Sequence, residues 1–179
     1  MNRWNFDPAY STVEFSIRNL WYTVHGRFPE IEGAIVLDQT DISRSSVVAV
    51  IKAGCLETGN ARRDAHLRTR EFFDVANFPE IEFESTKVER GRDRDSLTLE
   101  GRLTIKGHTE PVRLDVNEMD HSRSPRGEEF RYYSATTELD RFAFGINYGR
   151  MLIGRTLKVT INVQASARCA ENQTDRKAP

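Results

Sequence analysis

Apolar and polar residues alternate along most of the chain, which is the pattern of β-strands that bury one face. In the clearest row, Leu97, Leu99, Gly101, Leu103 and Ile105 alternate with polar residues. Comparable rows occupy residues 13–17, 31–37, 45–53, 81–83, 112–116, 131–139 and 157–163. About eight strands joined mostly by short polar turns predict an antiparallel sandwich or barrel.

Glycine interrupts two of the apolar rows, at Gly33 and Gly101. In a strand, glycine marks a bend, a bulge or the close approach of another group. We therefore expect one of these features at both positions.

The word FPEIE occurs twice, at 28–32 and at 78–82, but the residues around the two copies do not align. A true repeat would share more than one word. Pro29 and Pro79 fix their own φ and favour an extended residue before them, and alternating stretches begin at Ile31 and Ile81. We interpret both copies as the start of a strand.

One segment, residues 60–73, has helical periodicity and breaks the strand pattern. Asn60 is a suitable N-cap, and Ala61, Ala65, Thr69, Phe72 and Phe73 fall on one side. We expect this helix to lie across the sheet or over a barrel end. The polar stretch 168–179 has no periodicity and is expected to be a disordered tail.

Composition and charge narrow the function classes. The chain has 179 residues, of which 30% are charged, and this is typical of one soluble globular domain. Its net charge of −1 provides no overall positive field that would attract nucleic acid. No apolar run reaches the length of a membrane helix, so we expect no integral membrane segment. The first ten residues lack the pattern of a secretory signal peptide, in which a charged stretch precedes an apolar one. We expect a cytoplasmic protein as the sequence is written, or a periplasmic one if a leader is missing.

Candidate catalytic and metal-binding residues are few. Asp64 and His66 lie two positions apart on the expected helix, where side chains point in different directions. The sequence contains no nucleophile elbow, P-loop or dinucleotide motif, and Cys55 and Cys169 are expected to be free thiols. We therefore expect no catalytic residue, no metal ion and no other cofactor.

The arginines of the expected helix have simple structural explanations. Arg62 and Arg63 would either pair with acidic loops such as that of Glu57 or form a positive rim for an anionic head group. Asp64 and Arg68 have the spacing of a surface ion pair.

Several motifs in order resemble the YceI-like (polyisoprenoid-binding) family. TGNARRDAHLRTREFFDVANFPEIEF at 58–83 resembles the family signature, and GRLTIKGHTEPVRL at 101–114 resembles its strand hairpin. WNFDPAYSTVEFSIRNL at 4–20 and VHGRFPEIEGAI at 24–35 are similar to its first and second strands, and ELDRFAFGI at 138–146 is similar to the segment before its last strand. The resemblance covers residues 4–167, nearly the whole chain.

The resemblance implies an all-β fold, an extended eight-stranded antiparallel lipocalin-like β-barrel over 1–167, with the helix at about 60–73 near one barrel end. It also implies an apolar tunnel for a long isoprenoid or similar amphiphile: a polyprenyl phosphate, an isoprenoid quinone or a fatty amide. We expect carriage, storage or sequestration of such a lipid without catalysis. Tyr10 and Asn19 stand where family members often have His. This difference bears on which ligand head group the protein prefers.

Two alternatives to lipid binding remain open. The oligomeric state is also open, and a homodimer is one possibility. An eight-stranded barrel can hold one small ligand or be filled by its own side chains. An enzyme acting on lipid-like substrates, a hydrolase or isomerase, predicts converging polar groups in the lumen. A filled barrel acting as a protein-interaction module predicts no cavity.

The alternating rows identify the side chains that would face the lumen and contact the ligand. These are Phe15, Ile17, Ile31, Ile35, Phe83, Leu97, Leu99, Leu103, Leu114, Val159 and Ile161, with Phe72, Phe73 and Phe144 near one end. We expect His66 and Arg141 to brace the helix and a loop, with either able to reach a head group.

Overall fold

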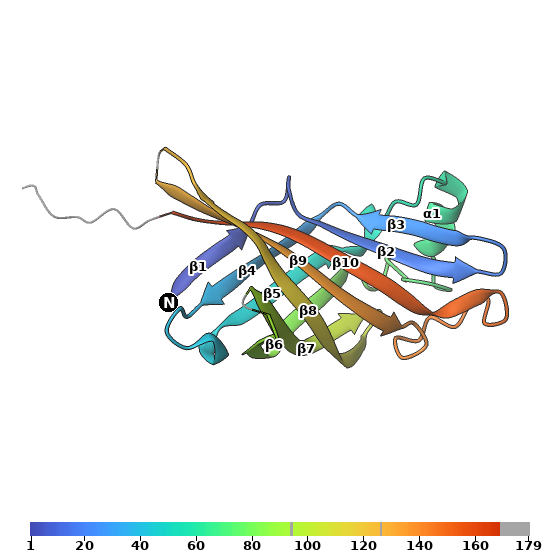
Figure 1. Ribbon diagram of the computed structural model, residues 1–179. Helices are drawn as coiled ribbons and strands as arrows, with labels where there is room; N and C mark the ends of the chain where they lie inside the picture. Colours follow the sequence, from blue (N-terminus) through green and yellow to red (C-terminus); the bar gives the residue numbers. More distant parts are fainter. Residues whose placement is uncertain (94, 126, 169–179) are drawn as a thin grey trace, which may run out of the picture.

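Within residues 1–93, 95–125 and 127–168, which the computed structural model describes, ten strands form one antiparallel sheet that closes on itself (Figure 1). The strands are β1 (Asn2–Phe6), β2 (Thr12–Asn19), β3 (Thr23–Phe28), β4 (Ile31–Leu37), β5 (Ser46–Lys52), β6 (Glu80–Arg90), β7 (Ser96–Ile105), β8 (His108–Arg123), β9 (Glu128–Asp140) and β10 (Ile153–Arg168). Their order is β1-β4-β5-β6-β7-β8-β9-β10-β2-β3, and β1 also pairs with β10.

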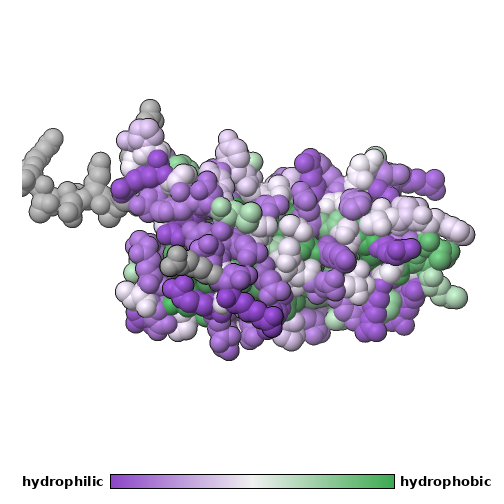
Figure 2. Space-filling view, in the orientation of Figure 1, coloured by the Kyte–Doolittle hydropathy of each residue, from purple (hydrophilic) through white to green (hydrophobic). Residues whose placement is uncertain are grey.

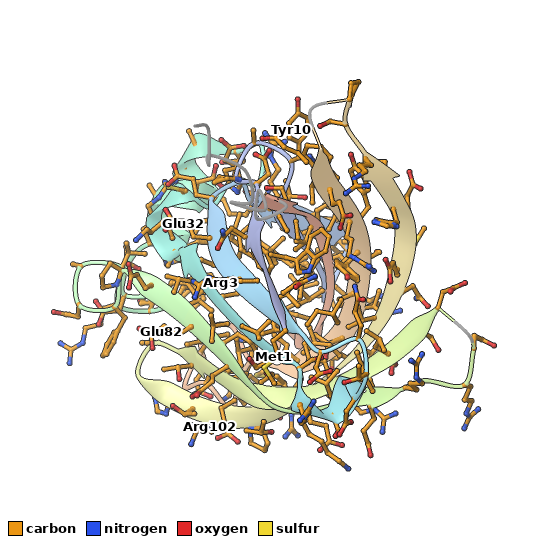
Figure 3. All side chains as sticks on the ribbon, turned by 90° about the vertical axis from the view of Figure 1, so that its left-hand side faces the viewer. Met1, Arg3, Tyr10, Glu32, Glu82 and Arg102 are labelled. Atoms are coloured by element: carbon orange, nitrogen blue, oxygen red, sulfur yellow. The ribbon has the colours of Figure 1, made fainter. Side chains whose placement is uncertain are left out.

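The barrel wall is eight strands around, because four of the ten strands combine in two pairs. β2 and β1 follow one another along the same edge of β10, β2 over residues 153–162 and β1 at Ala165 and Ser166. β3 pairs with β2, and β4 pairs with β1, so β3 and β4 also act as one interrupted strand. The expected all-β, eight-stranded antiparallel closed barrel is therefore confirmed. Figure 3 looks along it and shows a ring of strands around an interior occupied by side chains.

The two copies of FPEIE start strands on either side of β5. β4 begins at Ile31, two residues after Pro29, and β6 begins at Glu80, directly after Pro79. Ile31 and Ile81 both pair with Ile51, so three buried isoleucines lie in a row across β4, β5 and β6. The interpretation of both copies as strand starts is confirmed.

The segment between β5 and β6, residues 53–79, covers the end of the barrel away from the N-terminus (Figure 1), and we call it the cap. It contains a 3-10 turn, η2 (Ala53–Cys55), and the helix α1 (Ala61–Leu67). A second 3-10 turn, η1 (Ile42–Arg44), joins β4 to β5 at the opposite end.

The helix is present but shorter than expected. The Asn60 side chain accepts a hydrogen bond from the Arg63 N–H at 3.0 Å, so the N-cap is confirmed. The chain leaves the helix after Leu67 through hydrogen-bonded turns, and Asp74 adopts a left-handed conformation (φ 50°). The periodicity up to residue 73 therefore overstated the helix.

The apolar face expected for this helix was also wrong. Ala61, Ala65 and Thr69 are exposed, whereas Asp64 is buried. The Asp64 carboxylate accepts hydrogen bonds from the backbone N–H (3.0 Å) and the hydroxyl of Thr58, and these bonds stabilise its burial.

The expected ion pairs of the cap arginines are replaced by bonds to carbonyls. Arg68 does not pair with Asp64; its guanidinium donates to the carbonyls of Gly54 (2.7 Å) and Leu56 (2.8 Å). Glu57 pairs with Arg27 of β3 at 2.8 Å, and the two residues also exchange backbone hydrogen bonds. These contacts fix the cap to itself and to β3.

The described chain ends with the last strand of the barrel. β10 ends at Arg168, and the rest of the predicted tail, residues 169–179 with Cys169, lies outside the described residues. Cys55 is a free thiol, and a hydrogen bond to Glu30 together with burial raises its pKa. In the described ranges, no helix is both long enough and apolar enough to span a bilayer.

Candidate ligand-binding cavity

An elongated interior is possible because alternate residues of every wall strand point inward. The structure contains a cavity of about 190 Å³ inside the barrel. Its lining extends from Ile42 and Leu37 at the η1 end to Phe73, Phe144 and Ile146 at the capped end. The cavity wall therefore runs the length of the barrel.

The cavity wall is almost wholly apolar. Among the described residues that line it, all are hydrocarbon or aromatic side chains except Ser45, Thr137, Tyr133 and Arg141. None of these described lining residues is acidic. A wall of this kind suits an apolar ligand and offers few groups for a chemical step.

Most of the side chains expected to face the lumen line this cavity. They are Phe15, Ile31, Ile35, Phe73, Phe83, Leu97, Leu99, Leu103, Leu114, Phe144, Val159 and Ile161. Their contact with a ligand stays a prediction.

Two of the predicted positions do not line the cavity. Ile17 of β2 is absent from the lining, although its partner Leu157 on β10 belongs to it. Phe72 is buried and packs against His66 and Tyr148, with ring centroids 5.0 and 5.1 Å away. Of these two neighbouring phenylalanines, only Phe73 lines the cavity.

Sequence patterning missed the contribution of β9 to the cavity wall. Tyr133, Ala135, Thr137 and Leu139 of this strand all line the cavity. Because two of these four residues are polar and one is alanine, the strand has no apolar alternation that marks its inner face. Pairing of Ala135 with Ile161 of the neighbouring strand could have indicated it.

Three phenylalanines of the cavity wall lie flat against glycines. A Cβ built on Gly26 would stand 2.3 Å from Cζ of Phe15, and one on Gly101 would stand 2.5 Å from the ring of Phe83. Gly33 has the same relation to Phe6, at 2.5 Å. The close approach expected at Gly33 and Gly101 is therefore confirmed. The glycines leave room for the rings at the wall and keep them out of the lumen.

Arg141 holds the loop between β9 and β10 (residues 141–152) over the capped end. Its side chain, only 3% exposed, donates to the carbonyls of Ile146 (2.8 Å), Tyr148 (2.7 Å), Ile153 (3.0 Å) and Gly154 (2.7 Å). Burial lowers the pKa of the guanidinium, which nevertheless stays charged. Arg141 braces this loop, as expected, and four of its five N–H donors are used in doing so.

His66 connects the cap to the same loop. Its ring packs against Tyr148 with centroids 4.9 Å apart, and its Nε2 contacts the carboxylate of Glu71. Deeper in the barrel, Phe28 packs between Phe15 and Phe73, at 5.5 and 5.7 Å. The cap, the β9–β10 loop and the barrel wall are therefore joined through aromatic contacts.

A polar group lies at the opposite end of the cavity. Tyr133 reaches the lining there, and burial raises its pKa to about 12, with the nearby Glu118 carboxylate adding to the effect. Arg131 bonds to Glu118 at 2.5 Å and lies over the Trp4 ring, 4.9 Å from its centroid. Tyr133 is therefore a neutral phenol at ordinary pH.

The positions that depart from the family pattern lie away from the cavity. Tyr10 is exposed in the turn between β1 and β2, as labelled in Figure 3, and Asn19 ends β2. Neither lines the cavity. Within the described ranges, no three His, Cys, Asp or Glu side chains gather in a way that could hold a metal ion.

Comparison with known proteins assigns the chain to a family. The model of the YceI-like domain matches residues 4–165. The chain belongs to the YceI-like domain family. Protein YceI of Salmonella arizonae and that of Salmonella paratyphi B are each 30% identical over 159 residues, which is 88% of this chain and 82% of theirs.

Several solved structures share the fold. BcnA of Burkholderia cenocepacia superposes with a TM-score of 0.78 at 17% identity, over 89% of this chain and 98% of BcnA. A YCEI protein of Campylobacter jejuni gives 0.70 at 23% identity, over 82% of this chain and 86% of its own. A polyisoprenoid binding domain from Saccharophagus degradans, implicated in plant cell wall breakdown, gives 0.69 at 13%, over 93% and 99%.

Proposed function

We propose that the protein binds a long isoprenoid or similar amphiphilic lipid in the barrel cavity, for carriage, storage or sequestration, without a chemical step. The observation that carries the proposal is the nearly uninterrupted apolar lining from one barrel end to the other. Each 100 Å² of apolar ligand surface buried there contributes about 2.5 kcal/mol before the costs of association. A prenyl chain therefore needs few polar contacts to bind.

The lining also favours a ligand whose enclosed part is uncharged. Arg141 is the one cation of the described lining, and carbonyls already occupy most of its donors. Tyr133, Ser45 and Thr137 offer neutral hydroxyls. An isoprenoid quinone or a fatty amide fits this set inside the barrel, whereas the charged end of a polyprenyl phosphate would have to remain outside.

The alternatives predict different interiors. A filled barrel predicts no cavity, and a cavity is present. An enzyme predicts polar groups that converge on one point, whereas Tyr133 and Arg141 line different ends. Both observations support a binding protein over these alternatives.

The first test is native mass spectrometry of the purified protein, combined with organic extraction. We expect a bound lipid, or uptake of an added isoprenoid quinone in preference to a polyprenyl phosphate of equal chain length. If no lipid is recovered and neither compound binds, the proposed function is wrong.

A matched pair of variants on β9 tests the cavity itself. Ala135→Trp places a large ring in the lumen, whereas Thr136→Trp places the same ring on the outer face. We expect Ala135→Trp to weaken uptake at least about tenfold and Thr136→Trp to bind like the wild type. Equal binding by both folded variants would show that the ligand lies elsewhere.

A further inference from the structure

An exposed apolar surface lies at the capped end of the barrel. The turn between β2 and β3 carries Leu20, Trp21 and Tyr22, and the β9–β10 loop carries Met151 and Leu152. All five side chains are more than half exposed, with Trp21 at 85% and Met151 at 94%. We call these five residues the tip. Figure 2 shows apolar residues gathered there, at the end farthest from the N-terminus in Figure 1.

The two segments of the tip are joined to each other. The Leu20 N–H donates to the Leu152 carbonyl at 2.9 Å, and Asn19 pairs with Ile153 at the end of the β2–β10 ladder. The tip is therefore one connected surface at the end of the barrel. Contiguous exposed apolar side chains of this kind mark an interaction surface.

The two chain segments that form the tip carry charge of one sign. Residues 15–26 and 141–156, which include the tip, contain Arg18, Arg141, Arg150 and Arg155 but no Asp or Glu, although the chain as a whole has a net charge of −1. Arg155 pairs with Asp140, and Arg141 is buried. Arg18 and Arg150 are exposed, and in the described part of the chain neither forms an ion pair with an acidic side chain.

We propose that the tip docks the protein onto the surface of an anionic lipid bilayer. Trp and Tyr rings favour the level of the lipid head groups, and Leu and Met can enter the acyl region beneath. Arg18 and Arg150 would then meet anionic head groups, an attraction that salt screens. The single sign of charge on these two segments argues against a second copy as the occupant, because a symmetric dimer would bring these arginines together.

Docking at the tip places the bilayer beside the cavity. The same loop that carries Met151 and Leu152 supplies Arg141, Phe144 and Ile146 to the cavity lining. The inference thus rests on the proposed function for its purpose, since a lipid leaving the bilayer would meet the loop that closes the cavity. Vesicle binding itself does not require an occupied cavity.

Tryptophan fluorescence can report contact between the tip and a bilayer. It has two tryptophans, of which Trp4 is 1% exposed and Trp21 lies in the tip. With vesicles of equal parts phosphatidylglycerol and phosphatidylcholine, we expect co-sedimentation and a blue shift of the Trp21 emission. Both effects should weaken with added salt and with phosphatidylcholine alone.

Matched variants separate the tip from other exposed apolar residues. Trp21→Ser with Met151→Ser should reduce partitioning onto anionic vesicles at least about tenfold. Met119→Ser with Val48→Ser removes exposed apolar side chains elsewhere on the barrel and should leave partitioning unchanged. Arg18→Glu with Arg150→Glu should abolish the preference for the anionic vesicles.

The outcomes for docking and for lipid binding are independent. Ala135→Trp should lose lipid uptake but retain vesicle binding, and the Trp21→Ser, Met151→Ser variant should show the reverse with lipid added from ethanol. Lipid uptake by a wild-type protein that ignores both vesicle types would overturn docking alone. Vesicle binding without any lipid uptake would overturn the proposed function alone. A dimer that is lost in the Trp21→Ser, Met151→Ser variant would show that the tip binds a second copy and would also overturn docking.

Discussion

The ring of Phe15 lies directly over Gly26 on the neighbouring strand, so closely that a methyl group on Gly26 would stand 2.3 Å from Cζ of Phe15. The two residues pair across β2 and β3, and the ring lines the cavity. The absence of a side chain at Gly26 therefore sets how far the ring extends into the lumen.

Gly26→Ala should push the Phe15 ring into the cavity. We expect a loss of about 1–3 kcal/mol in the free energy of unfolding from overpacking, and weaker binding of the longest ligands. Urea unfolding and uptake of isoprenoids of graded length measure the two effects.

A second substitution tests the cause of that loss. Phe15→Leu in the Gly26→Ala background should recover most of the stability, because it removes the ring that the methyl group meets. Losses that simply add in the double-mutant cycle would contradict the contact.

Arg141→Ala should release the loop that covers the capped end. It leaves four carbonyls without their shared donor, and we expect a loss of about 3 kcal/mol in the free energy of unfolding. Chemical denaturation measures the loss, and hydrogen exchange should show faster exchange in residues 146–153. Arg155→Ala, which removes an exposed ion pair with Asp140, should cost less than about 1 kcal/mol.

Alkaline pH should destabilise the protein through Tyr133. Its pKa is raised to about 12 in the folded state, mainly by burial, whereas an unfolded tyrosine ionises near pH 10. Below pH 10 the phenol is protonated in both states; between pH 10 and 12 only the unfolded state loses the proton, so stability falls by roughly 2 kcal/mol. Denaturation at a series of pH values should show this fall, and Tyr133→Phe should remove it. An identical fall in the variant would assign it to other groups.

Acid should weaken the η1 end through Asp38. The Thr40 hydroxyl and the backbone N–H groups of Asp41 and Thr40 hold the pKa of this carboxyl far below its usual range, and Arg44 adds to the effect. Its stabilising contribution is therefore complete above the ordinary pKa of Asp, near 4, and is lost progressively as pH falls below that value. Melting temperature against pH should decline less steeply for Asp38→Asn than for the wild type, from a lower value at neutral pH. Parallel curves would contradict this assignment.

The wall of the barrel was predictable where apolar residues alternate without interruption. β7 and the central part of β10 follow from their rows of Leu, Val and Ile, and so do most of the cavity residues they contribute. The sequence of β9 predicted a strand but did not indicate which of its faces points into the barrel. Tyr133 and Thr137 line the cavity, but their residue types are typical of a protein surface.

The cap could not be derived from periodicity, because its order depends on contacts between residues distant in sequence. Lys106, in the turn between β7 and β8, donates to the Arg70 carbonyl at 2.8 Å, and Phe78 packs against Gly107. Such contacts favour turns over a longer helix after Leu67. The register that places Ile31 and Ile81 on either side of Ile51 likewise appears only when β4, β5 and β6 pair.

The bridge between Arg27 and Glu57 has a further consequence for how the barrel opens. β9 and β10 are paired without interruption from Asp140 and Thr156 to Glu128 and Arg168. Within the described chain, β3 is hydrogen-bonded to the cap through Arg27 and Glu57, by two backbone bonds of 2.8 and 2.9 Å and by the guanidinium of Arg27, which donates to the Glu57 carboxylate. Separating the cap from β3 thus breaks far fewer hydrogen bonds than separating any two long strands. Sideways opening beside the cap therefore breaks fewer hydrogen bonds than parting two of the long strands of the wall.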